Sequence, residues 1–104
     1  MDFKEMQKKM LETAKRYEKR HKLTIDENTA IIKLFEEVGE LAEAILTSRK
    51  KSRPDKHLPP KEAKTKISEE LADVIGMAIV VADRLKVDLG KAIENKWIYR
   101  KEKD

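Results

Sequence analysis

The sequence predicts an all-α fold, in the form of a bundle of four to five helices, and three observations support that prediction. Apolar residues recur at spacings of three and four along most of the chain, which is the period of one face of a helix. No segment shows the strict apolar and polar alternation of a half-buried strand. The 3 prolines all fall between residues 54 and 60, so they break the helical pattern in one place. With 104 residues and 39% hydrophobic side chains, we expect a single domain that spans residues 1–104.

The first helix is expected to begin after Asp2, a good N-cap residue, and to run to about Arg20. The segment HKLTID then interrupts the pattern. Thr24 followed three residues later by Glu27 fits the capping box that opens a second helix, over about residues 25–47. The apolar face of the first helix consists of Phe3, Met6, Met10, Leu11, Ala14 and Tyr17, and that of the second consists of Ile31, Leu34, Phe35, Val38, Leu41, Ala42, Ile45 and Leu46.

A loop rich in cations and proline follows, with the sequence TSRKKSRPDKHLPP over residues 47–60, and we expect it to be solvated and mobile. Pro60 suits the first turn of a third helix, which is expected to run to about Lys86. A fourth helix is expected to start at the N-cap Asp88, with Trp97 packed in the core.

The third predicted helix contains an unbroken run of apolar and glycine residues, 74–82, so apolar positions cover its whole circumference. A small bundle cannot readily cover every side of such a helix. We therefore expect Gly76, Ile79 and Val80 to contact another subunit, in a homodimer or a homotetramer.

Charged residues make up 42% of the chain, yet 24 basic and 20 acidic side chains leave a net charge of only +4. The signs are segregated along the chain. Residues 23–47 hold six acidic side chains and one basic one, whereas residues 1–22 hold eight basic and four acidic and residues 48–66 hold eight basic and two acidic. Because the acidic block would repel phosphate, general binding to nucleic acid is not expected.

Composition also limits the class of protein. The chain has no cysteine, which excludes a disulfide scaffold and a thiolate metal site, and His21 and His57 have no partner at ligand spacing. No run reaches the roughly 18 apolar residues of a membrane span, and the N-terminal MDFKEMQKKM lacks the apolar core of a signal peptide. We expect a cytoplasmic protein with no membrane partner, in which carboxylates would hold any metal.

Acidic residues three apart occur on both the second and the third predicted helices. Glu37 and Glu40 lie about 60° apart around the helix axis, and Glu70 and Asp73 have the same spacing. Glu70 also falls within the edge of an apolar arc, where an unpaired charge costs several kcal/mol. If the two pairs face one another at about 4 Å, each like-charge contact costs about 4 kcal/mol at an effective dielectric constant of 20.

Two interpretations of these acids compete. Each could be solvated or paired with a lysine such as Lys66 or Lys33, which is the interpretation we prefer for Glu43. For four acids together, a divalent cation satisfies the cluster better, and ligation by oxygen alone favours Mg²⁺ or Mn²⁺. Mg²⁺ held in this way usually works with substrate phosphates, so the cluster points to phosphoryl chemistry.

At these residues the sequence also resembles a known family. Glu36, Glu37 and Glu40 in EEVGE, followed by Glu70 and Asp73 in ELAD, are similar to the EExxE and ExxD motifs of the all-α nucleoside triphosphate pyrophosphatases, the MazG-like group. The resemblance extends from about Ile31 to Lys101. The 29 residues from 41 to 69 between the motifs are slightly more than is usual, and a surface loop tolerates such an insertion at little cost.

The resemblance implies an oligomeric enzyme that hydrolyses an NTP or dNTP to the nucleoside monophosphate and pyrophosphate with Mg²⁺. House-cleaning of non-canonical or surplus nucleotides is the expected role. The implied metal ligands are Glu37, Glu40, Glu70 and Asp73. Glu36 could hold a second ion or orient water, or could simply be solvated. Lys96 matches a lysine of the family and shares a helical face with Arg100, so these two side chains, with Asn95, are expected to bind substrate phosphate.

Two alternatives stay open. A related activity is that of phosphoribosyl-ATP pyrophosphohydrolase in histidine biosynthesis, although that group usually has a Tyr-His pair where this chain has Gly76 and Met77. The chain could also be a non-catalytic helical module that binds nucleic acid through residues 48–66. The cations of this loop could form a lid that attracts phosphate or could simply keep the loop soluble, and we favour the second interpretation for Arg49, Lys50, Lys51, Arg53 and Lys56.

Overall fold

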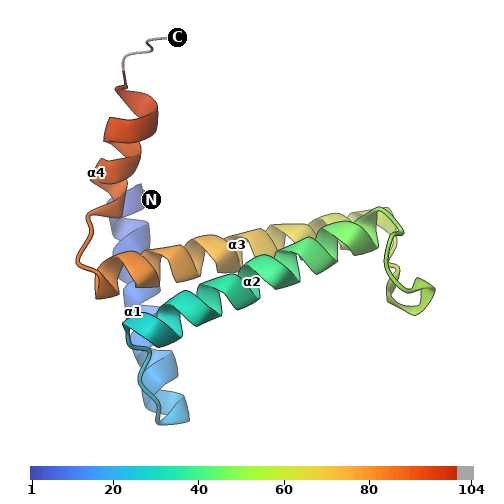
Figure 1. Ribbon diagram of the computed structural model, residues 1–104, viewed down its shortest axis with the longest axis horizontal. Helices are drawn as coiled ribbons and strands as arrows, with labels where there is room; N and C mark the ends of the chain where they lie inside the picture. The colour runs from blue at the N-terminus through green and yellow to red at the C-terminus, as the bar shows by residue number, and fades with distance from the viewer. Residues whose placement is uncertain (101–104) are drawn as a thin grey trace.

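The computed structural model of the protein describes residues 1–100, and its fold is all-α, as the sequence predicts (Figure 1). Within those residues there is no strand and no helix that is long and apolar enough to cross a membrane. The helices are α1 (Phe3–His21), α2 (Glu27–Ser48), α3 (Pro60–Arg84) and α4 (Leu89–Ile93), with a short 3-10 turn at Pro54–Lys56 and a π-helical turn at Glu94–Ile98.

The two longest helices, α2 and α3, form an antiparallel hairpin that is the main body of the molecule (Figure 1). Helix α1 crosses the end of this hairpin at which α2 begins and α3 ends, and α4 leaves from the same end. The basic loop, which contains the 3-10 turn, closes the opposite end. The middle of the hairpin therefore lies between a packed crossing and a charged loop.

Aspartate side chains start three of the helices. Asp2 and Asp88 accept hydrogen bonds from the backbone N–H groups of Glu5 and Lys91, as predicted. The predicted capping box at Thr24 is wrong, because Asp26 is the N-cap of α2 and its carboxylate accepts from Thr29 N at 2.8 Å. This hydrogen bond to the charged form lowers the pKa of Asp26.

The core lies where α1 crosses the hairpin. Its buried members are mostly small, and Gly76 helps α1 and α3 to approach closely, since a Cβ atom there would lie only 3.2 Å from Met10 Cε. Small side chains at a crossing allow the backbones to come together, so this end of the molecule is densely packed. The buried cluster consists of Ala14, Ile25, Ala30 and Val80, with Met10, Met77 and Val81 packed against it.

Polar contacts among Glu18, Ile25 and Arg84, together called the polar clamp, hold the crossing together. Glu18 on α1 accepts a hydrogen bond from Ile25 N at 2.7 Å through one carboxylate oxygen, and its other oxygen lies 3.5 Å from Arg84 Nη2. Arg84, in the last turn of α3, also donates from Nε to the Ile25 carbonyl oxygen at 2.7 Å. The connection between α1 and α2 is thereby tied to the end of α3.

Two sequence predictions about the apolar residues are wrong. Gly76, Ile79 and Val80 do not face outwards, because α1 covers them and each is buried within the chain. Trp97 is 73% exposed rather than packed in the core, since α4 turns away from the hairpin (Figure 1). The apolar residues that do remain exposed on the hairpin are Ile32, Phe35, Val38, Leu46, Leu71 and Ile75.

Candidate metal centre

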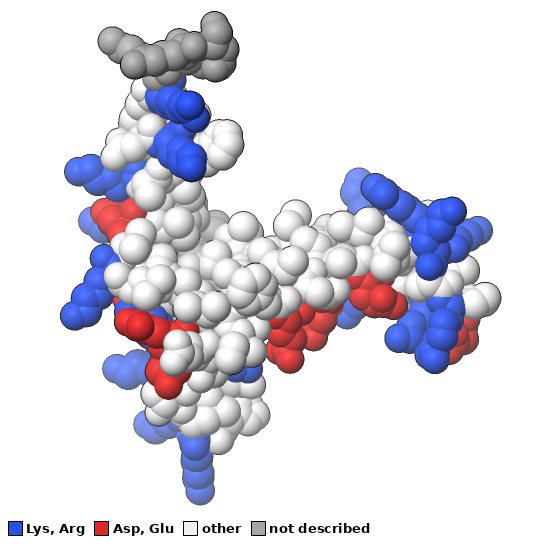
Figure 2. All heavy atoms as spheres, in the orientation of Figure 1, with Lys and Arg blue, Asp and Glu red and all other residues white. Residues whose placement is uncertain are grey.

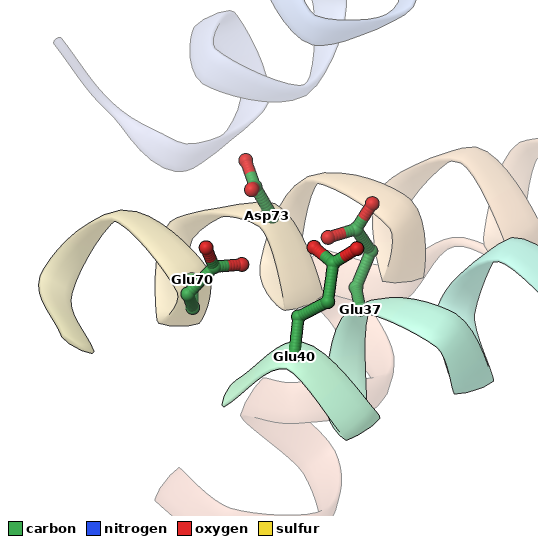
Figure 3. A group of neighbouring side chains, drawn as sticks. All are labelled: Glu37, Glu40, Glu70 and Asp73. Carbon is green, nitrogen blue, oxygen red and sulfur yellow. The ribbon is translucent and has the colours of Figure 1, made fainter. Parts of the chain in front are cut away.

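The hairpin brings the two predicted acidic pairs together. Glu37 and Glu40 come from α2, Glu70 and Asp73 come from α3, and one carboxylate oxygen of each lies within 4.8 Å of those of the other three. Figure 3 shows the side chains of α2 reaching across to those of α3. The convergence follows from the three-residue spacing on each helix, which places both acids of a pair on the same side, and from the antiparallel packing of the helices.

Burial differs within this acidic cluster. Glu70 is only 5% exposed, Glu37 is partly buried, and Glu40 and Asp73 are exposed. The Oε1 atom of Glu70 contacts Lys66 Nζ at 2.8 Å, which confirms the lysine partner that the sequence suggested. By contrast, Glu70 Oε2 and Glu37 Oε2 are buried with no hydrogen-bond partner among the described residues. Such buried acceptors are rare because each one loses its hydration without compensation.

The electrostatics of the cluster follow from crowding. Burial raises the pKa of Glu37 from its ordinary value near 4.5 to about 7, together with the negative charge of Glu40, a hydrogen bond between the two carboxyl groups, and the charges of Asp73 and Glu70. The pKa of Lys66 is also raised, because its contact with Glu70 favours the charged ammonium group. The cluster therefore holds more negative charge than its neighbouring cation neutralises.

These residues fit a divalent metal ion. Four carboxylates supply hard oxygen ligands, and the two buried oxygens without partners belong to the same cluster. A cation at this position would compensate the repulsion that raises the pKa of Glu37, and it would satisfy the orphaned acceptors. A structural salt-bridge network does not explain the arrangement equally well, since Lys66 contacts only one of the four acids closely.

The remaining acids and cations of α2 lie apart from the cluster. Glu36 is exposed and is not among the four carboxylates that converge. Glu43 is about half exposed and lies 4.0 Å from Lys56 of the basic loop. Lys33, the other suggested partner of the acids, instead lies 5.6 Å from the centre of the Tyr17 ring.

The predicted phosphate-binding residues are not brought to the carboxylates within one chain. Lys96 and Arg100 lie in and just after the π-helical turn, beyond α4, and both are exposed. Asn95 lines a separate groove between α1 and α4, together with Phe3 and Asp88. Because α4 leaves the hairpin at the crossing, these residues lie at the end of an arm rather than over the cluster (Figure 1).

A cleft beside the acidic cluster was missed by sequence reasoning. Its volume is about 360 Å³, it shares Glu40 and Glu70 with the cluster, and Lys56 and Lys66 are its basic residues. The four-residue spacing of Lys66 and Glu70 was a usable signal for one of these cations. No sequence pattern could place Lys56, because it reaches the cleft through the path of the loop.

The fold and the cluster together define a class, namely helical proteins with a candidate metal site built from carboxylate pairs on two antiparallel helices. The family model of the MazG nucleotide pyrophosphohydrolase domain matches residues 25–103, and the chain belongs to this family. The match confirms the resemblance that the two acidic motifs suggested and includes all four carboxylates. No curated protein and no solved structure matches the chain.

Proposed function

We propose that the protein hydrolyses a nucleoside triphosphate, either an NTP or a dNTP, to the monophosphate and pyrophosphate with Mg²⁺ as the cofactor. Its membership of a nucleotide pyrophosphohydrolase family supports the general activity. The observation that carries the proposal is the convergence of four carboxylates, two of which have a buried oxygen without a partner. Mn²⁺ could substitute for Mg²⁺, because both ions take oxygen ligands in similar geometry.

In this proposal Glu37, Glu40, Glu70 and Asp73 hold the metal. Bound Mg²⁺ would supply two things that hydrolysis at the α-phosphorus needs, namely neutralisation of phosphate oxygens and a lowered pKa of a water molecule. The packed hairpin keeps the carboxylates in place before substrate arrives, which lowers the cost of organising the charged site. Lys66 holds the Glu70 carboxylate in position through their 2.8 Å contact.

We propose house-cleaning as the biological role, with the cytoplasmic nucleotide pool as the source of non-canonical or surplus substrate. The test is a panel of NTPs, dNTPs and phosphoribosyl-ATP, in which pyrophosphate release is measured with Mg²⁺ and with a chelator. We expect release that requires the metal. A protein that hydrolyses none of the panel, while binding DNA or RNA in a salt-sensitive way, would contradict the proposal and support a nucleic-acid-binding module.

The same assay tests the ligands. Glu37→Gln and Asp73→Asn each remove one charge while preserving shape, and we expect metal-dependent hydrolysis to be lost in both although the far-ultraviolet circular dichroism of the helices is unchanged. Glu27→Gln is the matched control, because Glu27 also lies on α2 but belongs neither to the four converging carboxylates nor to the lining of the cleft beside them. Activity that persists in both ligand variants would remove the acidic cluster from the mechanism.

We propose further that the protein is a homo-oligomer, a dimer or a tetramer. The chain is extended for its size: its radius of gyration is 16.4 Å, whereas a compact chain of this length would have about 13 Å. Its accessible surface is 8551 Å², compared with the roughly 6000 Å² expected for a compact monomer of this mass. Exposed apolar side chains follow α2, among them Ile32 at 68% and Phe35 at 71%. A partner subunit would cover such a surface.

This oligomer would also give the exposed cations beyond α4 a role. Lys96 and Arg100 do not lie at the cluster of their own chain, so we propose that they reach the phosphates bound to another subunit. Sedimentation velocity of the full chain tests the assembly, and Phe35→Lys is expected to shift it towards the monomer. Mixing inactive Glu37→Gln with inactive Lys96→Ala subunits should restore part of the activity if the site is shared, and should restore none if each chain works alone.

A further inference from the structure

We propose that Lys56, on the basic loop, binds the β- and γ-phosphates of the substrate in the cleft beside the acidic cluster. The inference rests on the proposed function, and it identifies which end of the nucleotide the cleft takes. It differs from the interpretation that we favoured from the sequence, in which the cations of the loop only keep it soluble.

The basic loop is organised by specific contacts. It leaves α2 through a turn in which Lys51 N donates to the Leu46 carbonyl oxygen at 2.8 Å, with Lys50 in the left-handed conformation. The buried hydroxyl group of Thr47 lies 3.0 Å from the hydroxyl group of Ser52. These bonds fold the loop back onto the end of α2.

A second contact fixes the part of the loop that carries Lys56. The ring nitrogen Nε2 of His57 donates to the Ser52 carbonyl oxygen at 3.0 Å, which spans the 3-10 turn. His57 is therefore partly buried, rather than free in solvent as its sequence context suggested. The turn points the Lys56 side chain back to α2, where Nζ lies 4.0 Å from Glu43.

The contact between Lys56 and Glu43 is a weak one. The separation is at the outer limit of an ion pair, and about half of each side chain is exposed, so solvent screens the attraction. Lys66 differs, because its shorter contact with the buried Glu70 holds it at the acidic cluster. Lys56 is thus the cation of the cleft that can move to an incoming anion without leaving a buried carboxylate unpaired.

The cleft has the size and chemistry of a phosphate subsite. Its volume of about 360 Å³ is within the range of small-molecule sites, and it opens directly from the acidic cluster through the shared Glu40 and Glu70. Its wall consists of short apolar side chains such as Ala44 and Ala63, and no aromatic ring lines it to stack on a base. Figure 2 shows the basic side chains at this end of the hairpin next to the acidic ones along its edge.

The charge balance of the cleft also favours the terminal phosphates. Three carboxylates and two ammonium groups line it, so without metal it is slightly negative and would repel an anion. A divalent cation at the neighbouring cluster reverses that sign. Of the three phosphates of the substrate, the β- and γ-phosphates carry the most negative charge, so their attraction to Lys56 is the strongest. We therefore place these two phosphates, which leave as pyrophosphate, in the cleft.

Calorimetric titration of the full-length protein with pyrophosphate and with AMP, both in Mg²⁺, tests this assignment. For Lys56→Ala we expect pyrophosphate affinity to fall by about tenfold or more, as for other hydrogen bonds to charged groups, with AMP affinity within about twofold of wild type. Lys56→Arg should restore most of the affinity. Lys51→Ala is the matched control, since it removes the same charge from the same loop without lining the cleft, and its effect should stay within about twofold.

Equal losses in Lys56→Ala and Lys51→Ala would overturn the assignment, because the loop would then act only through its overall charge. A loss for AMP alone would place the nucleoside end in the cleft, and a wild-type protein that does not bind pyrophosphate would refute a phosphate subsite. These outcomes are separate from the hydrolysis assay. If the protein does not hydrolyse nucleotides but Lys56→Ala weakens pyrophosphate binding as predicted, the proposed activity is wrong and the phosphate subsite stands. If the protein shows metal-dependent hydrolysis but Lys56→Ala binds pyrophosphate as the wild type does, the activity stands and the subsite is wrong.

Discussion

Two glutamates on this chain are held in opposite ways, and the difference concerns whether both oxygens of each carboxylate have a partner. Glu18 lies at the helix crossing, where Ile25 N–H satisfies one oxygen and Arg84 approaches the other. Glu70 lies in the middle of the hairpin and is more deeply buried, yet only its Oε1 atom has a partner, Lys66. The extent of burial alone does not explain the contrast. The number of carboxylate oxygens with a partner differs, and for that reason we propose Glu70, and not Glu18, as a metal ligand.

The neighbours of each glutamate explain this contrast. At the crossing, one cation, Arg84, and one backbone N–H group, that of Ile25, face the Glu18 carboxylate. In the middle of the hairpin, two carboxylates of α2, those of Glu37 and Glu40, each have an oxygen within 4.8 Å of a Glu70 oxygen. Uncompensated charge at short range costs stability, so such a cluster favours either protonation or a bound cation.

The largest expected effect is on activity. Glu70→Gln should lower the rate of Mg²⁺-dependent pyrophosphate release by about 100-fold or more, because it removes a charged metal ligand and leaves its shape. Glu18→Gln, the same substitution at the crossing, should leave the rate per folded molecule unchanged. If both variants lose the same activity per folded molecule, the proposed difference between Glu70 and Glu18 is wrong.

The next effect is on stability. Arg84→Ala should lower the free energy of unfolding by about 2 kcal/mol, because Glu18 and the Ile25 carbonyl oxygen lose a partner in a partly buried place. The melting temperature should fall by roughly 10 °C in a domain of this size. Arg53→Ala breaks the exposed pair with Asp55 and should change the free energy by less than about 0.5 kcal/mol. Chemical denaturation measures the free energy of unfolding of both variants. Equal values would show that the polar clamp stabilises the protein no more than an ordinary surface ion pair does.

A third effect concerns pH in the absence of metal. The pKa of Glu37 is raised to about 7, so the folded protein binds more protons than the unfolded chain between about pH 4.5 and pH 7. Stability in a chelator should therefore fall as the pH rises through this range and level off above it. Because Glu37 is only partly buried, solvent screens much of the effect, and the melting temperature should decrease by roughly 5 °C. Glu37→Gln should abolish the fall, and so should Mg²⁺. A melting temperature that rises over this interval, or the same fall in Glu37→Gln, would show that Glu37 is not the source of the pH dependence.

The smallest effect is at the start of α2. Asp26→Ala should lower the melting temperature slightly, because Thr29 N–H loses its acceptor, while Thr24→Ala should have no effect. Since the hydrogen bond lowers the pKa of Asp26, its contribution should be lost on acidification, as the carboxylate becomes protonated. Thermal melts of both variants at neutral and acidic pH test this, and pyrophosphate release should be unchanged in either. A larger decrease in melting temperature for Thr24→Ala than for Asp26→Ala would show that Thr24 caps the helix, as the sequence suggested.

Much of the architecture could be predicted from periodicity. Apolar spacing and the prolines place the long helices to within about two residues, since these signals depend on local geometry. The same geometry predicts that Glu37 and Glu40 share one helical face and that Glu70 and Asp73 share another. Thr24 was mistaken for the N-cap because two residues in that segment can cap a helix, and the hydrogen bond of Ile25 to Glu18 of another helix decided between them.

The predictions that failed depend on contacts between segments distant in sequence. The apolar run of α3 suggested a subunit interface, but α1 folds across it and buries Val80 completely. Trp97 had the spacing of a core residue, yet α4 leaves the hairpin and exposes it. Neither result is encoded in the period of one helix, because a period says which side chains lie together and does not say what covers them.

The sequence by itself therefore determined the helices, the paired acids on α2 and α3, and the family to which the chain belongs. Tertiary structure alone decided that the pairs meet, that one oxygen each of Glu37 and Glu70 has no partner among the described residues, and that Lys56 lies at the cleft beside them. The physical reason is one of range. Helical geometry relates residues three or four apart, whereas desolvation and charge compensation depend on which helices and loops pack around a side chain.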